Sequence, residues 1–187
     1  MAGAMILVSG MCGTGKSAFA QWLGERLELP AVHYHRLLRR VKELDPQAAK
    51  GGELAYQLFL FELEEHMGCA FIADYIFSAR QEDWLRELTE AHGCKTVNIH
   101  FDCEPSTACA RYTRRNQEDA APTRPEVSFD LFQQAVRQSR AFLWGGELIP
   151  VNTEDFGQVS YPEILEKVER VLYPQNRPRG EGLCLTD

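Results

Sequence analysis

The stretch that decides the fold is residues 5–27, which read MILVSGMCGTGKSAFAQWLGERL. Its central part, GMCGTGKS at residues 10–17, matches the phosphate-binding loop pattern G-x-x-x-x-G-K-[ST] in full. The apolar run at residues 6–8 predicts a short buried strand before the loop. After the loop, Phe19, Leu23 and Leu27 recur at four-residue steps, which predicts the buried face of a helix. A strand, a glycine-rich loop and a helix in this order are the context that the pattern requires.

The residue types in the loop suit the phosphates of a nucleoside triphosphate. Its glycines let the backbone curl with the N–H groups pointing inward, and the following helix adds partial positive charge at its N-terminus. Lys16 can reach the outer phosphates, and the Ser17 hydroxyl can ligate Mg²⁺. We therefore expect ATP and Mg²⁺ as cofactors. The predicted nucleotide-binding residues are Gly10, Met11, Cys12, Gly13, Thr14, Gly15, Lys16 and Ser17.

The composition indicates one soluble domain. Of the 187 residues, 44% are hydrophobic and 25% are charged, which is ordinary for a globular protein. The net charge of −7 argues against a nucleic-acid partner held by a broad basic face, but not against a small anionic substrate in a locally basic cleft. No apolar run approaches the ~18 residues of a membrane-spanning helix, so we expect no membrane partner. The six cysteines form no C-x-x-C pair and predict reduced thiols in a cytoplasmic protein.

Four further apolar runs predict strands that alternate with helices. The runs are residues 29–32, 69–74, 97–102 and 148–151. Helices are predicted for residues 36–67, with a break at 46–52, for 79–92, and for a stretch that begins at Pro105. Two more are predicted for 129–143, closed by Gly145 and Gly146, and for 161–172. This alternation implies an α/β fold, with a five-stranded parallel sheet and helices on both faces. Residues 1–173 then form one domain, and the proline- and glycine-containing residues 174–187 a disordered tail.

Polar residues follow several of these strands. Ligands of parallel sheets bind beyond the carboxyl ends of the strands, so we expect the phosphate loop to lie near His35, Asp74, Asp102 and Asn152-Thr153. Asp74 ends an apolar strand, where it could hold Mg²⁺ through water or accept a proton from a substrate hydroxyl. The alternative is that it only caps a helix or faces solvent.

Two basic stretches stand out in this acidic chain. Arg36, Arg39, Arg40 and Lys42 share one predicted helix within the 36–67 region, either as a solvated face or as a patch toward the substrate. Arg111, Arg114 and Arg115 precede a polar segment with two prolines, so residues 111–126 are expected to form a mobile lid that closes over the γ-phosphate. Arg111 and Arg114 are three residues apart and are predicted to face the same way, although an exposed helix face is the alternative.

The chain resembles the small P-loop kinases, and most of all the AAA-type, zeta-toxin-like ATP-binding proteins, which are similar to chloramphenicol phosphotransferase, gluconate kinase and shikimate kinase. The resemblance covers residues 5–173. It rests on ILVSGMCGTGKSAFA, on FIADYIFSARQEDWLREL with Asp74 and Arg80, on NIHFDCEPSTACARYTRR, and on LIPVNTED. It implies that Arg111 and Arg114 act in the lid, and that Asn152 and Thr153 border the adenine. We expect His35, Arg39 and Arg80 on the substrate side.

One position departs from the pattern of these kinases. They commonly carry an acidic residue just after the second strand, where it orients or deprotonates the substrate hydroxyl. Here the position reads His33-Tyr34-His35-Arg36, so either Asp74 or His35 is the base.

The resulting prediction is an ATP-dependent phosphotransferase that moves the γ-phosphate of ATP to a hydroxyl of a small molecule. Lys16, Asp74, Arg111 and Arg114 are its predicted catalytic residues, and Ser17 and Asp74 its metal-binding residues. We expect a monomer or homodimer. The alternatives are a nucleotide or nucleic-acid-end kinase of the same fold, or a nucleotide-binding regulatory protein without transfer activity.

Overall fold

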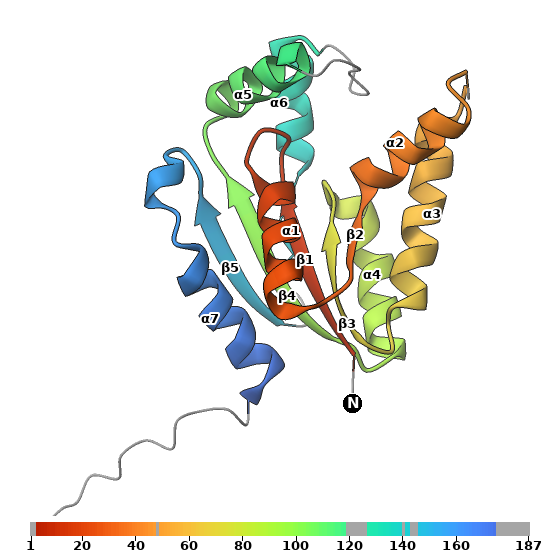
Figure 1. The fold of residues 1–187 in the computed structure, drawn as a ribbon, viewed down its shortest axis with the longest axis vertical. Helices are drawn as coiled ribbons and strands as arrows, with labels where there is room; N and C mark the ends of the chain where they lie inside the picture. The colour runs from red at the N-terminus through yellow and green to blue at the C-terminus, as the bar shows by residue number, and fades with distance from the viewer. Residues whose placement is uncertain (1–2, 48, 119–126, 140, 143–145, 175–187) are drawn as a thin grey trace, which may run out of the picture.

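The computed structural model describes residues 3–47, 49–118, 127–139, 141–142 and 146–174. Five strands form one parallel sheet in the order β2-β3-β1-β4-β5 (Figure 1). The strands are β1 (Ala4–Gly10), β2 (Ala31–His33), β3 (Ala70–Asp74), β4 (Lys95–Asp102) and β5 (Gly146–Asn152). The helices are α1 (Lys16–Leu27), α2 (Tyr34–Leu44), α3 (Gly51–Glu65), α4 (Ala79–Ala91), α5 (Pro105–Glu118), α6 (Phe129–Gln138) and α7 (Tyr161–Leu172), with the short 3₁₀ helix η1 (Phe156–Gln158).

Helices cover both faces of the sheet, as the alternation of strands and helices predicts. Successive side chains of a strand point to opposite faces, so the fully buried strand β1 contributes to two cores. Ile6 and Val8 pack in the core that contains residues of α1 and α7, whereas Leu7 packs in the core that contains residues of α3 and α4. The α/β fold with a parallel sheet is therefore confirmed.

A third, smaller core attaches α5 and α6 to the phosphate loop. Met11 of the loop packs with Ala108 and Tyr112 of α5 and with Phe132 of α6. In Figure 1, α5 and α6 lie beyond the carboxyl ends of the strands, and α2 and α3 rise on the other side of the same end of the sheet. The phosphate loop lies between these two pairs of helices, so residues from both pairs can reach it.

The observed boundaries correct three predictions. The second strand is Ala31–His33 instead of residues 29–32, because it begins only after Pro30, so His33 is its last residue and α2 begins at Tyr34. The helix predicted for 129–143 ends at Gln138, since Ser139 has an extended backbone and bridges Ser78. Gly146 does not close that helix but starts β5, where the backbone lies so close to Thr96 that an added Cβ would be 1.6 Å from the Thr96 carbonyl oxygen.

Other predictions fall partly outside the described residues. Of the predicted lid, residues 111–118 belong to α5, and 119–126 lie outside the described residues, as do 175–187 of the predicted tail. The five cysteines that the structure describes are free thiols. Within the described part of the chain, every helix is too short or too polar to cross a membrane.

Candidate functional site

The phosphate loop has a backbone that only glycine adopts readily. Gly10 and Gly13 have φ angles of +129° and +86°. A Cβ at Gly10 would lie 2.2 Å from the carbonyl oxygen of Phe101, and one at Gly13 would lie 2.2 Å from that of Ala108. The Thr14 hydroxyl donates a hydrogen bond of 2.7 Å to the Met11 carbonyl and closes the loop. Since α1 begins directly after the loop, its N-terminal N–H groups point toward the space that a phosphate would occupy.

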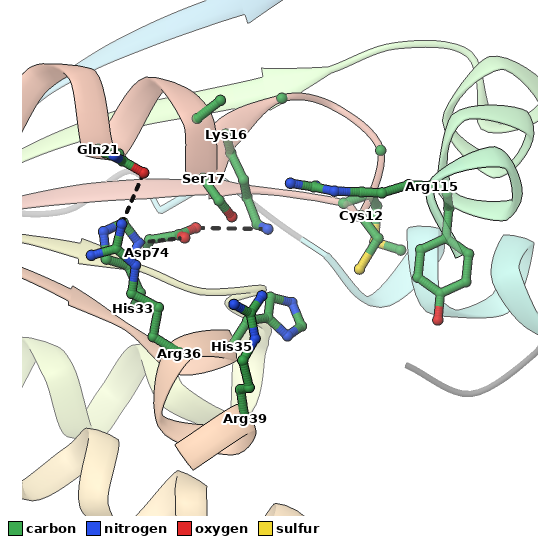
Figure 2. Close-up of a pocket in the computed structure, with 15 residues that line it drawn as sticks. Cys12, Lys16, Ser17, Gln21, His33, His35, Arg36, Arg39, Asp74 and Arg115 are labelled. Carbon is green, nitrogen blue, oxygen red and sulfur yellow. Dashed lines mark hydrogen bonds and ion pairs between the residues drawn. The ribbon is translucent and has the colours of Figure 1, made fainter. Parts of the chain in front are cut away.

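Beside the loop lies a cavity of about 280 Å³, shown in Figure 2. It brings together nine predicted site residues: Met11, Cys12, Gly13 and Gly15 of the loop, Lys16 and Ser17 of α1, His35 and Arg39 of α2, and Asp74 of β3. Its other lining residues are Ala18, Gln21, His33, Arg36, Tyr112 and Arg115. The sequence prediction that the strand ends meet at the phosphate loop therefore holds for β2 and β3.

Three buried polar side chains form the floor of this cavity. Asp74 Oδ1 lies 3.7 Å from Lys16 Nζ, and Asp74 Oδ2 lies 2.9 Å from His33 Nδ1. Each of the three side chains is at most 5% exposed. Burial disfavours the charged form of Asp74, but the Lys16 charge and hydrogen bonds from His33 and Ser17 outweigh it and lower the pKa of Asp74 to about 2. The carboxylate is thus ionised at all physiological pH values.

Two atoms of this floor have no hydrogen-bond partner. They are His33 Nε2 and Asp74 Oδ1; both are buried, and Asp74 Oδ1 is contacted by the Lys16 ammonium at 3.7 Å, beyond hydrogen-bond distance. When His33 donates its Nδ1 proton to Asp74, its Nε2 becomes a free acceptor. Buried polar atoms are nearly always hydrogen-bonded in proteins, so these two atoms are available to a water molecule or a polar ligand in the cavity.

The residues of the site fit Mg²⁺. The Ser17 hydroxyl and the unpartnered Asp74 oxygen are hard oxygen ligands that line the same cavity. Among the described residues, no cluster of three or more His, Cys, Asp or Glu side chains could hold a metal without other ligands. Mg²⁺ takes one or two protein ligands and completes its shell with water and phosphate.

Arg111 lies elsewhere than the lid prediction implies. Its guanidinium donates hydrogen bonds of 2.7 Å and 2.9 Å to the carbonyl oxygens of Thr153 and Glu154, and it stacks 4.2 Å above the Phe156 ring. It therefore ties α5 to the segment after β5. Arg114 is largely exposed, with its Nε 3.8 Å from Glu118, whereas Arg115 lines the cavity beside Lys16. Arg111 and Arg115 are four residues apart, which places them on one side of α5. The predicted pair, Arg111 and Arg114, did not include Arg115.

Asn152 and Thr153 do not line the cavities beside the phosphate loop. Thr153 is fully buried and its hydroxyl bonds the Asp102 carbonyl, while the Asn152 side chain accepts from the Glu154 N–H. A second cavity of about 490 Å³ adjoins the loop instead. Its lining includes Gly13, Gly15, Ala18, Arg111, Arg114, Arg115, Phe156, Val159 and Tyr161. Neither Asn152 nor Thr153 lines this second cavity, whereas Phe156 and Val159, which follow them, do.

His33 is the main site residue that the sequence prediction missed. The prediction favoured Asp74 or His35 as the base, and His35 does line the cavity, but His33 is the histidine bonded to Asp74. The signal was present in the topology, since parallel β2 and β3 pair with His33 beside Asp74. Finding it required the end of the second strand to be placed correctly. Arg80 is the second residue of α4, and its side chain lies outside the described residues.

No family model matches the sequence, and no curated protein matches it either. A candidate kinase from Chloroflexus aurantiacus matches with a TM-score of 0.79 at 16% identity, over 91% of this chain and 99% of that one. Kti12 from Chaetomium thermophilum, solved with ADP-AlF3, has a TM-score of 0.67 at 15% identity, with 89% and 98% covered. A gluconokinase from Sinorhizobium meliloti gives 0.55 at 17% identity, with 93% and 97% covered. Together with the geometry of the loop, these matches show that the chain has the P-loop kinase fold.

Proposed function

We propose that the protein is an ATP-dependent phosphotransferase that moves the γ-phosphate of ATP to a hydroxyl group of a small molecule. The observation that carries this proposal is the polar floor beside the phosphate loop, where Lys16, Asp74 and His33 meet and two buried atoms lack partners. A protein that only binds a nucleotide needs the loop, but it does not need a second polar site next to the terminal phosphate.

The loop side of the site would hold the nucleotide. Backbone N–H groups of the loop and the Lys16 ammonium would bind the phosphates, and Arg115 would add a second positive charge from α5. Ser17 and Asp74 would hold Mg²⁺, which neutralises charge on the phosphate oxygens when it is bound. The second cavity, where the Arg111 guanidinium covers Phe156, would take the adenine and ribose.

The opposite side of the cavity would hold the acceptor. The acceptor hydroxyl would donate to the free Nε2 of His33, while His35 and Arg39 of α2 line the same space. With a pKa of about 2, Asp74 is a weak proton acceptor, so it is better suited to holding Lys16 and the metal than to acting as the base. Phosphoryl transfer through a loose transition state depends mainly on positioning and charge neutralisation, which this arrangement supplies.

The test is an incubation of the protein with ATP, Mg²⁺ and a panel of hydroxylated metabolites and antibiotics, with products read by mass spectrometry. Lys16→Ala serves as the inactive variant, because removing one charge on the transferred group typically costs a hundredfold or more, about 3 kcal/mol. Lys50→Ala is the matched control, since Lys50 is 84% exposed and pairs only with Glu53 among the described residues. Equal product formation by the wild type and a folded Lys16→Ala protein would contradict the proposal.

A nucleotide is a second candidate for the acceptor. The observation that favours it is the presence of Arg36 and Arg39 at the α2 side of the cavity, where they could meet a phosphate. Nucleosides and nucleoside monophosphates therefore belong in the same panel.

A further inference from the structure

We infer that the protein forms a homodimer in which the α3 helices of two copies pack antiparallel across a twofold axis. The contact surface is the outer face of α3, which exposes Leu54, Leu58 and Phe61. This inference goes beyond the proposed function and does not depend on it, because no residue of α3 lines either cavity beside the phosphate loop.

α3 has two apolar faces, and within the described part of the chain only one of them is covered. Phe59 and Leu63 are at most 1% exposed and pack in the core beneath the helix. Leu54, Leu58 and Phe61 follow one another at steps of four and three residues, which places them together on another face. They are 52%, 39% and 57% exposed, and α3 lies at the edge of the molecule beside α2 (Figure 1).

The grouping of these three side chains distinguishes them from the other exposed apolar residues. Single exposed apolar side chains are ordinary on protein surfaces, whereas a contiguous group marks an interaction surface. The described residues expose five other large hydrophobic side chains, and no other helix or strand contributes more than two of them. The outer face of α3 is therefore the helix face with the most exposed large apolar side chains in the described part of the molecule.

The order of residues along α3 makes this face complementary to itself. A twofold axis makes each contact twice, because residue i of one copy meets residue j of the other and the reverse. With the axis between Gln57 and Leu58, Leu54 of each copy lies opposite Phe61 of the other, at equal distances from the axis. The two Leu58 side chains then meet next to the axis. All three apolar side chains thus gain an apolar partner from a second copy of the chain.

The charges at the two ends of α3 fit the same arrangement. The same axis places Lys50, which precedes the first residue of one helix, opposite Glu65, the last residue of the other. The Lys50 side chain is 84% exposed, and its ammonium lies 3.8 Å from Glu53 in a surface pair that leaves it able to meet a second carboxylate. Glu64 and Glu65 are exposed as well. Each acidic helix end thus meets the positive N-terminal end of the other helix, which an antiparallel pair supplies and a parallel pair does not.

The size of this face predicts a weak dimer. A helix of 15 residues is about 22 Å long, so two of them bury less than the ~1,600 Å² of a standard stable interface. Small interfaces are typical of transient complexes, and we expect a dissociation constant between about 1 and 100 µM.

Sedimentation equilibrium of the full chain, up to about 300 µM, measures this dimer. Phe61→Asp places a carboxylate in the apolar contact twice per dimer, and it should raise the dissociation constant at least about tenfold. Leu131→Asp on α6 is the matched control, because Leu131 is also 57% exposed, and it should change the constant by less than about twofold. Thermal melts check that both variants fold. A wild-type chain that stays monomeric throughout, or equal weakening by both variants, overturns the inference.

Two charge-reversal variants test the antiparallel arrangement. Lys50→Glu and Glu65→Lys should each raise the dissociation constant about three- to tenfold, because like charges then meet at both ends of the helix pair. Mixed in equal amounts, the two variants should associate about as tightly as the wild type, since each end of the mixed dimer then joins a lysine and a glutamate. Association that is no tighter in the mixture than in either variant alone overturns the inference. The measurement needs no nucleotide, so its outcome is separate from that of the proposed transfer.

Discussion

At the scale of single residues, the contact between His33 and Asp74 sets the chemistry of the site. His33 supplies one hydrogen bond to the carboxylate, and its other ring nitrogen, Nε2, is buried without a hydrogen-bond partner. A carboxylate in place of His33 would be repelled by Asp74 at this distance. A histidine tolerates the neighbouring carboxylate and still offers an acceptor.

His33→Asn separates these two functions. The asparagine amide takes the place of Nδ1 and can still donate to Asp74, but nothing replaces Nε2. We expect turnover to fall at least about tenfold with little change in melting temperature, because a group that positions the acceptor is lost while the buried carboxylate keeps its partner. His35→Asn should lose less, since the hydrogen bond of 2.9 Å to Asp74 comes from His33. Steady-state kinetics of the two variants tests this prediction. A larger loss of turnover in His35→Asn would mean that His35, and not His33, accepts the hydrogen bond from the substrate hydroxyl.

The low pKa of Asp74 predicts a specific dependence of stability on pH. Its folded pKa of about 2 lies below the unfolded value of about 3.9, so its ionised form stabilises the fold above pH 4. As the pH falls toward 2, the unfolded chain takes up the proton first, and the contribution, on the order of 2 kcal/mol, disappears. The difference in unfolding free energy between the wild type and Asp74→Asn should therefore shrink by about half from pH 7 to pH 3. Urea unfolding at both pH values measures it, and an unchanged difference would contradict the low pKa.

At the scale of elements, Arg111 links α5 to the segment that follows β5. Its two hydrogen bonds to carbonyl oxygens and its stacking on Phe156 join elements that are over 40 residues apart in the sequence. Glu154 reinforces the link by accepting a hydrogen bond of 2.9 Å from the Glu104 N–H. Thr107 of α5 also donates a hydrogen bond to Glu154, but Arg111 is the α5 residue that both holds this segment and lines the second cavity with Phe156.

Arg111→Ala should therefore weaken ADP binding more than it lowers turnover at saturating ATP. The reason is that the wall of the proposed adenine cavity loosens, while Lys16 and Arg115 still face the terminal phosphate. We expect a loss of about tenfold in ADP affinity, in line with the removal of hydrogen bonds to a charged donor. Arg86→Ala is the control, because Arg86 lines neither cavity, pairs with Asp83 on the surface of α4 and should change affinity by less than about twofold. A fall in turnover with unchanged ADP affinity in Arg111→Ala would restore the lid interpretation.

At the scale of the whole molecule, the sequence predicts the structural features that depend on residues close together in the chain. The strand, loop and helix around Lys16 are specified by adjacent residues, and so are the start of α7 at its Ser160 cap and the end of α4 before Gly93. Contacts between distant segments are less predictable. The pairing of His33 with Asp74 depends on where β2 ends, and the place of Arg111 depends on how α5 packs against the segment after β5. Neither is visible in the spacing of residues on one element.

The phosphate loop joins both cores of the molecule, and this predicts how a nucleotide affects stability. β1 packs on both faces, α1 covers one of them, and Met11 ties the loop to α5 and α6. A nucleotide that binds only the folded chain stabilises it by about 2.7 kcal/mol at a hundredfold excess over its dissociation constant. For a domain of this size that corresponds to a rise of about 5–10 °C in melting temperature.

We therefore expect ADP with Mg²⁺ to raise the melting temperature by several degrees, as measured by scanning calorimetry. Chelation of the metal should reduce the shift, because Ser17 and Asp74 would then face the phosphates without the cation between them. Lys16→Ala should reduce it further, whereas Lys50→Ala should retain it, since Lys50 lies on the exposed surface of the chain. An equal shift in wild type and Lys16→Ala would mean that the nucleotide binds away from the loop. No shift at millimolar ADP would contradict nucleotide binding itself, and with it the proposed transfer.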